Sequence, residues 1–470
     1  MVSTKPLFYR QNNGPSKDIG KQPRFIEWPL NRFTERVFFE LSKSLNMRIL
    51  LITLFLLITV YANCQPLLPV DKCKTPVDLK KERYLDSLMT IIGNKRIVAL
   101  GEDTHGTAEF YILRAAITQR LIKEKGFNMV ILENPHEDMM ALQEGLQNIS
   151  LDTLMRRHLF SIYQTKQMQS FLEWFKKYSR KHKSLRLAGC DDSYRELLPQ
   201  NLIKAAAKYN NAGLNSMCEE FLYRQTLSIE EFYKHYPALK PDTLPKQMQF
   251  GVATWQLLTQ IDSLSRAQKM QDPVLNELLF HAKTNYAYYD KFSKKQYVSR
   301  DEIMGNRINY YAADSTKKII VWAHSGHIAK YAWLYNELGL MGATVQKKFP
   351  ADYMAIGMSS GQGSYSYIKN RFINNDHEFT DSLFKGILHT SKEGSWNELL
   401  INNTISNYYL NFSRLTTEEQ NEFNKQRPIK FLGYGQEEKK LSDYYDVSLT
   451  KLFDVLIFLK ETTQTTALFN

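Results

Sequence analysis

The feature that most constrains the fold is a series of short apolar runs, each ending in an acid or a histidine. Lys95–Glu102 (KRIVALGE) and Asn128–Asn134 (NMVILEN) flank Thr107–Lys125, a segment with helical spacing. Its apolar residues fall on one helical face: Phe110, Leu113, Ile117 and Leu121. A strand, a helix and a second strand in this order build parallel sheets with right-handed crossovers. The segment therefore predicts a β-α-β unit.

The same pattern recurs further along the chain. Four more apolar runs predict strands: Leu185–Asp191, Lys318–His324, Tyr353–Ser359 and Phe453–Glu461. Residues 196–315 instead indicate mostly helix. With 470 residues and 43% hydrophobic content, the chain can bury a large core. We predict an α/β fold with a central, mostly parallel sheet flanked by helices over residues 83–465, and a large helical insertion at about 196–315.

The N-terminal region resembles an export signal. Ile49–Ala62 contains 14 residues without a charge, which is shorter than the ~20 residues that span a bilayer and typical of a signal-peptide core. Met47 supplies a start just before it. We interpret residues 47–62 as a signal peptide, residues 1–46 as an over-extended N-terminus and residues 63–82 as a linker.

Export predicts a periplasmic or outer-membrane-associated protein without a membrane span after signal removal. Cys64 follows the predicted cleavage site, so a lipid anchor there is an open alternative, although Tyr61 and Asn63 are poor residues before a lipidated cysteine. The chain has four cysteines and no CxxC pair. This number is too small for a disulfide framework in a chain of this length, and a zinc ribbon is excluded.

The net charge of +12 does not indicate nucleic-acid binding. Residues 1–62 carry nine Lys or Arg and four Asp or Glu, so +5 of the charge lies in the leader. The remaining +7 is spread over roughly 400 residues without a long basic run. This distribution is typical of a solvated surface, and no nucleic-acid partner is expected.

Three predicted strands end in residues that can carry chemistry: Glu102 with His105, Glu133, and His324 with His327. Ligands bind at the carboxyl ends of strands in open parallel sheets. His105 lies in a short glycine-flanked turn and is the candidate general base. The two glutamates could orient the imidazole or a water, or one could act as an acid. The alternative is that they only cap the helices that follow.

Arg114 lies at the border of the apolar face of its helix. We expect it to pair with Glu102 and Glu133, because a desolvated guanidinium needs a partner, although it could instead reach solvent. His324 and His327 could share the first turn of a helix. The histidines and glutamates together could hold zinc, but no HExxH motif is present. No cofactor or metal is expected, and a metal remains the alternative.

Several of these motifs resemble those of the erythromycin esterase family. ALGEDTHGTAEFY, a helical Arg and GFNMVILEN resemble its opening motifs, and WAHSGHIAK resembles its second histidine motif. GCDDS, RDEIMGNR, GMSSGQGSY and FDVLIFLKETTQTT resemble its third strand end, the helix before the second histidine motif and its closing segments. The resemblance runs in order from about residue 77 to residue 465.

The resemblance implies a metal-independent hydrolase that opens a macrolide lactone, or another small-molecule ester, with water. It implies His105 as general base, helped by Glu102 and Glu133, with Arg114, His324 and His327 at the remaining polar positions of the cleft. Arg114, or a protonated His324 or His327, could stabilise the oxyanion. The helical insertion would line the cleft.

Three rival hypotheses remain. Gly357–Gly361 matches G-x-S-x-G, with Ser359 as a possible nucleophile. However, the residues that follow indicate a turn or strand, whereas a nucleophile elbow leads into a helix. The second rival is a metal-dependent hydrolase with the same acids and histidines. The third is a non-catalytic envelope binding protein, because a fold alone does not determine a function.

Overall fold

A computed structural model describes residues 68–81, 83–191, 197–227, 246–270, 272–294, 296, 298–332, 340–369, 382–389, 391–433 and 443–469. The proposed leader, its cleavage site and Cys64 lie outside these residues, so the predictions about export and lipidation stay predictions. In the part of the chain that is described, no helix combines the length and the apolarity needed to cross a bilayer.

The predicted α/β fold is confirmed. The main sheet has the order β1-β8-β11-β6-β2-β5-β3-β4, and β7 pairs with β6. The six predicted strands correspond to β2 (Ile97–Leu100), β3 (Met129–Pro135), β4 (Arg186–Asp191), β5 (Ile319–Trp322), β6 (Tyr353–Tyr367) and β11 (Val455–Thr462). Neighbouring strands among these six are parallel.

The antiparallel strands of the sheet were not predicted. They are β1 (Lys74–Pro76), β7 (Phe384–Leu388) and β8 (Asn407–Asn411). A separate two-stranded sheet joins β9 (Arg427–Lys430) to β10 (Tyr444–Val447). Every residue of β2, β3 and β5 is buried, which explains why these strands have continuous apolar runs rather than alternation.

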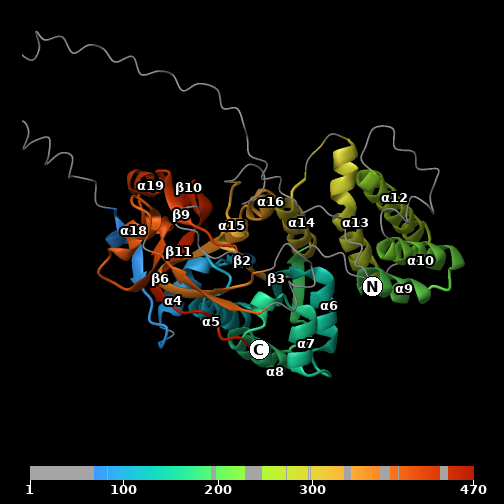
Figure 1. Ribbon diagram of the computed structural model, residues 1–470, viewed down its shortest axis with the longest axis horizontal. Helices are drawn as coiled ribbons and strands as arrows, with labels where there is room; N and C mark the ends of the chain where they lie inside the picture. Colours follow the sequence, from blue (N-terminus) through green and yellow to red (C-terminus); the bar gives the residue numbers. More distant parts are fainter. Residues whose placement is uncertain are drawn as a thin grey trace, which may run out of the picture. The chain divides into compact units, whose positions relative to one another are not determined.

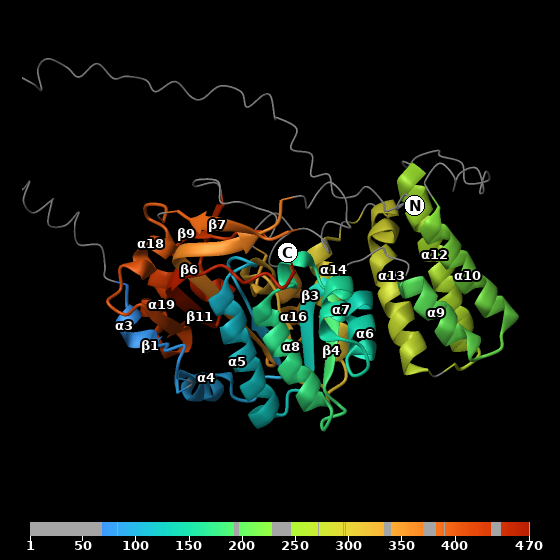
Figure 2. The same cartoon turned by 60° about the horizontal axis from the view of Figure 1, so that its bottom comes forward.

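Helices α5 and α8 cover one part of the sheet, and Figure 2 shows them side by side. The predicted apolar face of α5 is buried in the main core. The helices outside the insertion are α3 (Val70–Cys73), α4 (Tyr84–Ile92), α5 (Ala108–Lys125), α6 (His136–Gly145), α7 (Leu151–His158), α8 (Lys166–Ser179), α15 (Ser325–Ile328), α16 (Leu340–Lys348), α18 (Trp396–Ile401), α19 (Thr417–Asn424) and α20 (Leu449–Leu452), with 3-10 turns η1 (Ser161–Tyr163) and η2 (Phe412–Arg414).

The region expected as a helical insertion contains α9 (Leu197–Ala207), α10 (Ala212–Thr226), α12 (Lys246–Ala267), α13 (Pro273–Ser293) and α14 (Arg300–Ala312). The first four pack around a second hydrophobic core, to which α6 contributes Met140, and Figure 1 shows them as one group. In contrast, α14 packs mainly against α16 and also against β4. This last helix therefore belongs with the sheet, close to the strand ends.

The G-x-S-x-G sequence lies inside β6 and not in an elbow. The strand continues past Gly361 to Tyr367. Ser359 is buried, and its hydroxyl donates a hydrogen bond to Asp103 Oδ2 at 3.2 Å. This geometry lacks the strand-to-helix turn of a serine nucleophile.

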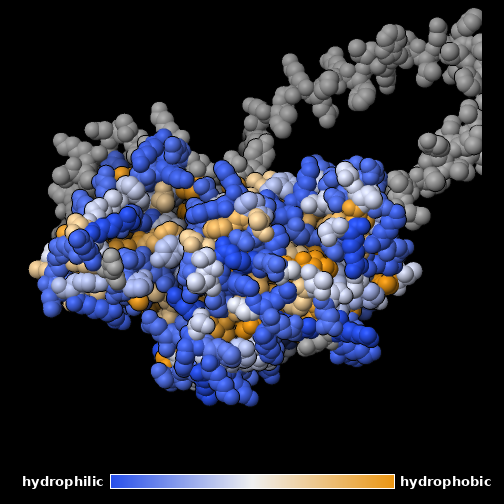
Figure 3. All heavy atoms as spheres, turned by 180° about the vertical axis from the view of Figure 1, so that it is seen from behind, coloured by the Kyte–Doolittle hydropathy of each residue, from blue (hydrophilic) through white to orange (hydrophobic). Residues whose placement is uncertain are grey.

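The surface carries no large apolar area in the view of Figure 3, where small hydrophobic regions lie among hydrophilic residues. The exposed large apolar side chains come from separate elements: Ile112, Ile149, Tyr223, Val274 and Ile387. Isolated exposed apolar residues are normal and do not indicate a partner.

Candidate active site

The turn that carries His105 is fixed by close backbone packing. Gly106 lies against β6, where Ser366 N–H donates to its carbonyl at 2.9 Å. A Cβ at this position would lie 2.0 Å from the Ser366 carbonyl oxygen. Only glycine allows this approach, so the glycine at position 106 determines the position of the turn and of His105 within it.

The His105 imidazole is held by a buried ion pair. Its Nδ1 lies 3.0 Å from Glu102 Oε1, and the other carboxylate oxygen lies 2.6 Å from Arg114 Nη2. Glu102 and Arg114 are completely buried, and the guanidinium also lies over the rings of Tyr111 and Trp322. With the Nδ1 proton donated to Glu102, the basic lone pair is on Nε2.

A second acid–histidine group forms at the end of β3. His327 Nε2 lies 3.2 Å from Glu133 Oε1, and its Nδ1 contacts Asp301 Oδ1. Burial alone would lower the pKa of His327, but the two carboxylates outweigh it and raise the pKa to about 10. Burial also acts to raise the pKa of Glu133, yet the charge of His327 holds it well below its usual value. This group is therefore an ion pair at neutral pH.

His324 lies between these two groups, with its ring centroid 5.1 Å from that of His105. Its Nδ1 accepts a hydrogen bond from Gly326 N–H, and its Nε2 faces the Asp103 carbonyl at 3.2 Å. Burial, together with the neighbouring histidines, holds the pKa of His324 well below its usual value. A neutral imidazole with both nitrogens engaged positions its neighbours and is poorly placed to serve as a cationic oxyanion donor.

The structure thus brings the six predicted residues to adjoining strand ends, in two hydrogen-bonded groups on either side of His324. Arg114 pairs with Glu102, one of its two expected partners, whereas the guanidinium that pairs with Glu133, at 3.4 Å, is that of Arg300 rather than Arg114. Among these side chains Arg300 is the most accessible, at 22% exposure, whereas His105 and Glu133 are 5% exposed.

Sequence reasoning did not select four further residues of the site: Asp103, Asp191, Arg300 and Asp301. Arg300 Nε donates to Asp191 Oδ1 at 2.7 Å. Asp103 accepts hydrogen bonds from the Ser360 backbone and hydroxyl. Burial raises the pKa of Asp103 to about 6, against the opposing charge of Lys430. The signals were present: Asp191 ends a predicted strand, and RDEIMGNR begins with Arg300 and Asp301.

Protein groups contact His105 Nδ1 and both nitrogens of His324 and His327. Across the described ranges, no three or more His, Cys, Asp or Glu side chains form a group that could hold a metal ion. The expectation that the protein needs no metal stays a prediction.

Comparison with known proteins decides the family. The sequence pattern described as "Erythromycin esterase" matches residues 122–462, more than half of the chain. The chain belongs to the erythromycin esterase family. The match begins after Glu102, His105 and Arg114, so the assignment of these three residues to the site of this family member rests on their geometry.

Relatives of this erythromycin esterase family member are distant in sequence. It is 22% identical over 289 residues to the "Putative hydrolase YbfO" of Bacillus subtilis, a match that covers 56% of this chain and 63% of that protein. It is 21% identical over 309 residues to "Erythromycin esterase type II" of Escherichia coli, covering 59% of this chain and 71% of the relative.

Solved structures share the fold. A protein from Bacillus cereus superposes with a TM-score of 0.70 at 21% identity, covering 85% of this chain and 97% of the other. A mutant of the erythromycin esterase EreC in its open conformation superposes with a TM-score of 0.61 at 16% identity, covering 83% and 96%. At these identities the likeness establishes the fold alone.

Proposed function

We propose that this protein hydrolyses a carboxylic ester, with His105 activating the attacking water. The observation that carries the proposal is the buried arrangement in which Arg114 and Glu102 hold His105 in one tautomer. Glu102 orients the ring and stabilises the imidazolium that forms when His105 takes a proton. The hydrolase names of the relatives support the same reaction class.

The reaction balances with water as the only co-reactant. His105 Nε2 takes a proton from water while the water oxygen bonds to the ester carbonyl carbon. The resulting tetrahedral oxyanion collapses, the carbon–oxygen bond to the alcohol breaks, and the imidazolium returns its proton to the leaving oxygen. The products are an acid and an alcohol, which stay joined if the substrate is a lactone.

The oxyanion needs a cation or hydrogen-bond donor. Arg114 is completely buried behind Glu102, and both nitrogens of His324 face protein partners. Arg300 is cationic, partly accessible and bound to Glu133 and Asp191 beside His327. We therefore assign oxyanion stabilisation to Arg300 in this proposal, with the His327 cation adding to the local positive charge.

The substrate in this proposal is a macrolide lactone or another small-molecule ester, by analogy with the relative named erythromycin esterase. An exported protein in the periplasm or at the outer membrane, with or without a lipid on Cys64, would meet such compounds outside the cytoplasm. The rivals are a metal-dependent hydrolase and a binding protein without turnover.

A mass-spectrometric screen of macrolides and simple esters tests the proposal. The wild type should add one water to a substrate, and His105→Ala should lose about 10²–10⁴-fold in rate, the usual contribution of a general base. His182→Ala is the matched control, because His182 is exposed, stacks on Tyr178 and precedes β4, whereas Asp191 of the site lies at the other end of that strand. Full turnover by His105→Ala would refute the mechanism, and loss of activity on metal chelation would favour the metal-dependent rival.

A further inference from the structure

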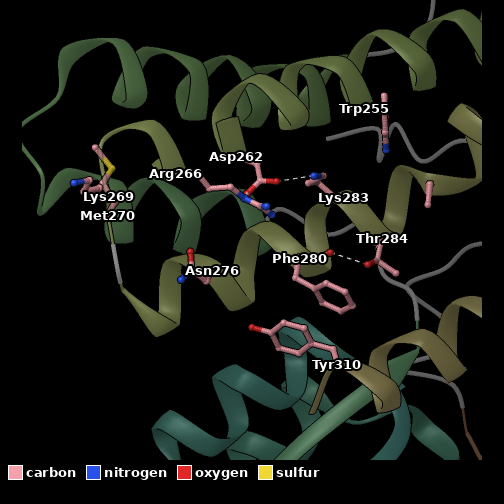
Figure 4. Close-up of a pocket in the computed structure, with 11 residues that line it drawn as sticks. Trp255, Asp262, Arg266, Lys269, Met270, Asn276, Phe280, Lys283, Thr284 and Tyr310 are labelled. Carbon is pink, nitrogen blue, oxygen red and sulfur yellow. Dashed lines mark hydrogen bonds and ion pairs between the residues drawn. The ribbon is translucent and has the colours of Figure 1, made fainter. Parts of the chain in front are cut away.

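The helical insertion contains a cleft that the candidate active site does not use. It has a volume of about 670 Å³ and is lined by residues of α12, α13 and α14 (Figure 4). Drug-sized ligands occupy pockets of ~300–1,000 Å³. On α14 the cleft residue Tyr310 lies ten residues beyond Arg300, which is about 15 Å along a helix. The cleft is therefore separate from the strand-end site.

Three partly exposed aromatic side chains provide flat apolar surface in this cleft. They are Trp255 of α12, Phe280 of α13 and Tyr310 of α14. The rings of Phe280 and Tyr310 are stacked with centroids 4.1 Å apart. Aromatic side chains contribute large contact areas and specific ring geometry to binding. The body of a matching ligand is accordingly flat and apolar.

The charged lining residues favour a ligand of negative charge. Arg266, Lys269 and Lys283 line the cleft together with a single carboxylate, that of Asp262. Lys283 and Arg266 both pair with this carboxylate, at 2.6 and 2.9 Å. Lys269 has no ion pair with any carboxylate of the described residues. The three cations exceed the one carboxylate by two charges, which an anionic ligand would offset.

Lys269 also occupies a backbone conformation that favours glycine. Its φ is 54°, in the turn after α12, where its N–H bonds the Arg266 carbonyl. The left-handed region costs a non-glycine residue roughly 1–2 kcal/mol, and glycine is the usual choice after a helix. A lysine in this strained position, at the edge of a cleft, points to a role for its side chain.

We propose that this cleft binds an organic anion whose negative group contacts Lys269, Lys283 and Arg266 while its flat apolar body packs against Trp255, Phe280 and Tyr310. Figure 4 shows the Asp262–Lys283 pair in the lining of the cleft, with the Phe280 and Tyr310 rings facing one another. Binding partly replaces Asp262 as the partner of the two cations on α12 and α13.

Calorimetric titration with 2-naphthalenesulfonate, and with the uncharged 2-naphthalenemethanol, tests the charge requirement. The sulfonate should bind at least about tenfold more tightly, a difference of about 1.4 kcal/mol. Its affinity should fall with added salt, because exposed charges are screened. Equal affinities for the two compounds, or no binding of the sulfonate, would overturn the proposal.

Two substitutions with opposite expected signs locate the site. Lys269→Gly should weaken sulfonate binding about fivefold to tenfold while the melting temperature stays equal or rises, because glycine relieves the left-handed strain. Asp262→Asn should tighten binding, because it removes the carboxylate that competes for the two cations. Lys204→Ala, an exposed lysine of α9 outside the cleft, is the control and should change nothing. Unchanged affinity in both cleft variants would contradict the assignment, as would loss of sulfonate binding in His105→Ala.

Discussion

At the residue scale, the site depends on buried carboxylates that each bind at least two partners. Glu102 divides its two oxygens between His105 and Arg114, and Glu133 binds His327, Arg300 and the backbone N–H of His324. A buried carboxylate is stable only with such compensation, because desolvation of a charge costs several kcal/mol. For His105, the contact with Glu102 makes Nδ1 the protonated nitrogen and Nε2 the basic one.

Arg114→Met should destabilise the protein by about 3–5 kcal/mol, because it leaves the buried Glu102 carboxylate without its cation. Urea unfolding followed by circular dichroism measures the loss. Arg120→Met is the matched control on the same helix, since Arg120 is 19% exposed and pairs with Asp86 at the surface; it should cost about 0–1 kcal/mol. Equal losses in the two variants would contradict the buried-pair interpretation.

Asp301→Asn should lower the pKa of His327, because it removes one of the two carboxylates that raise this pKa to about 10. Because the folded-state pKa of His327 is raised, protonation of this ring stabilises the folded protein fully at pH values below the unfolded-state pKa near 6.5. This stabilisation is lost as the pH rises toward 10. In the variant, the stabilisation should be lost at a lower pH than in wild type. Nuclear magnetic resonance titration of the ring measures the shift, and an unchanged pKa would exclude Asp301 as a cause.

At the scale of elements, the turns after the parallel strands decide where the chemistry lies. The turn after β2 packs on the backbone of β6, and His324 caps the start of α15, where its ring accepts the Gly326 N–H. Short helices and turns of this kind hold side chains through backbone hydrogen bonds. They therefore transmit small backbone shifts directly to the site.

Gly106→Ala should lower both stability and turnover, because the new Cβ would overlap the Ser366 backbone and displace the turn that carries His105. Gly213→Ala is the contrasting change. A Cβ there meets only the Asn211 side chain at 3.4 Å, and alanine is favoured over glycine in a helix by about 1 kcal/mol. Thermal unfolding and ester turnover of both variants give the comparison; similar behaviour of the two would argue against a packed turn.

At the scale of the whole molecule, polar contacts join α13 of the insertion to β4 and α14. Glu277 of α13 pairs with the partly exposed Arg186 of β4 at 3.1 Å. Arg307 of α14 donates to the Cys190 carbonyl and also to the side-chain oxygen of Asn285 on α13. His136 of α6 stacks on His281 of α13 with ring centroids 4.1 Å apart. Burial, with the charge of Arg307 adding to it, holds the pKa of each ring well below its usual value.

Mild acid should therefore loosen this contact. A histidine with a lowered folded-state pKa does not reduce the unfolding free energy at pH values above its unfolded-state pKa near 6.5. Below that pH, the unfolding free energy falls by up to about 1.4 kcal/mol per pH unit for each ring. The charge of Arg307 disfavours protonation of both rings and that of Arg186 disfavours protonation of His281, while the Asp191 backbone opposes the effect at His136. Between pH 7 and pH 5.5, the unfolding free energy should drop less in His281→Phe, which keeps the ring stacking, than in wild type. His182→Phe, at the surface, should follow wild type; identical slopes in all three would refute the coupling.

Much of the fold followed from local pattern. Continuous apolar runs placed six strands, and a helical period placed α5, because burial on both faces of a parallel sheet selects β-branched and aliphatic residues over each whole strand. The antiparallel strands β1, β7 and β8 were not predicted, because strands of three to five residues are too short to show a clear alternation of apolar and polar residues. The residue types at the strand ends indicated where a site could form, because parallel strands share one carboxyl edge.

The sequence by itself determined the α/β class, the order of the parallel strands along the chain and the six candidate side chains at their ends. Only the tertiary structure decided which partners those side chains have. Tertiary folding pairs His327 with Asp301 and Glu133. It also pairs Arg300 with Asp191, and Asp103 with Ser360. Both nitrogens of His324 bind backbone groups. The physical reason is that secondary structure reflects neighbours three or four residues apart, whereas a buried charge is satisfied by groups that folding brings from distant parts of the chain.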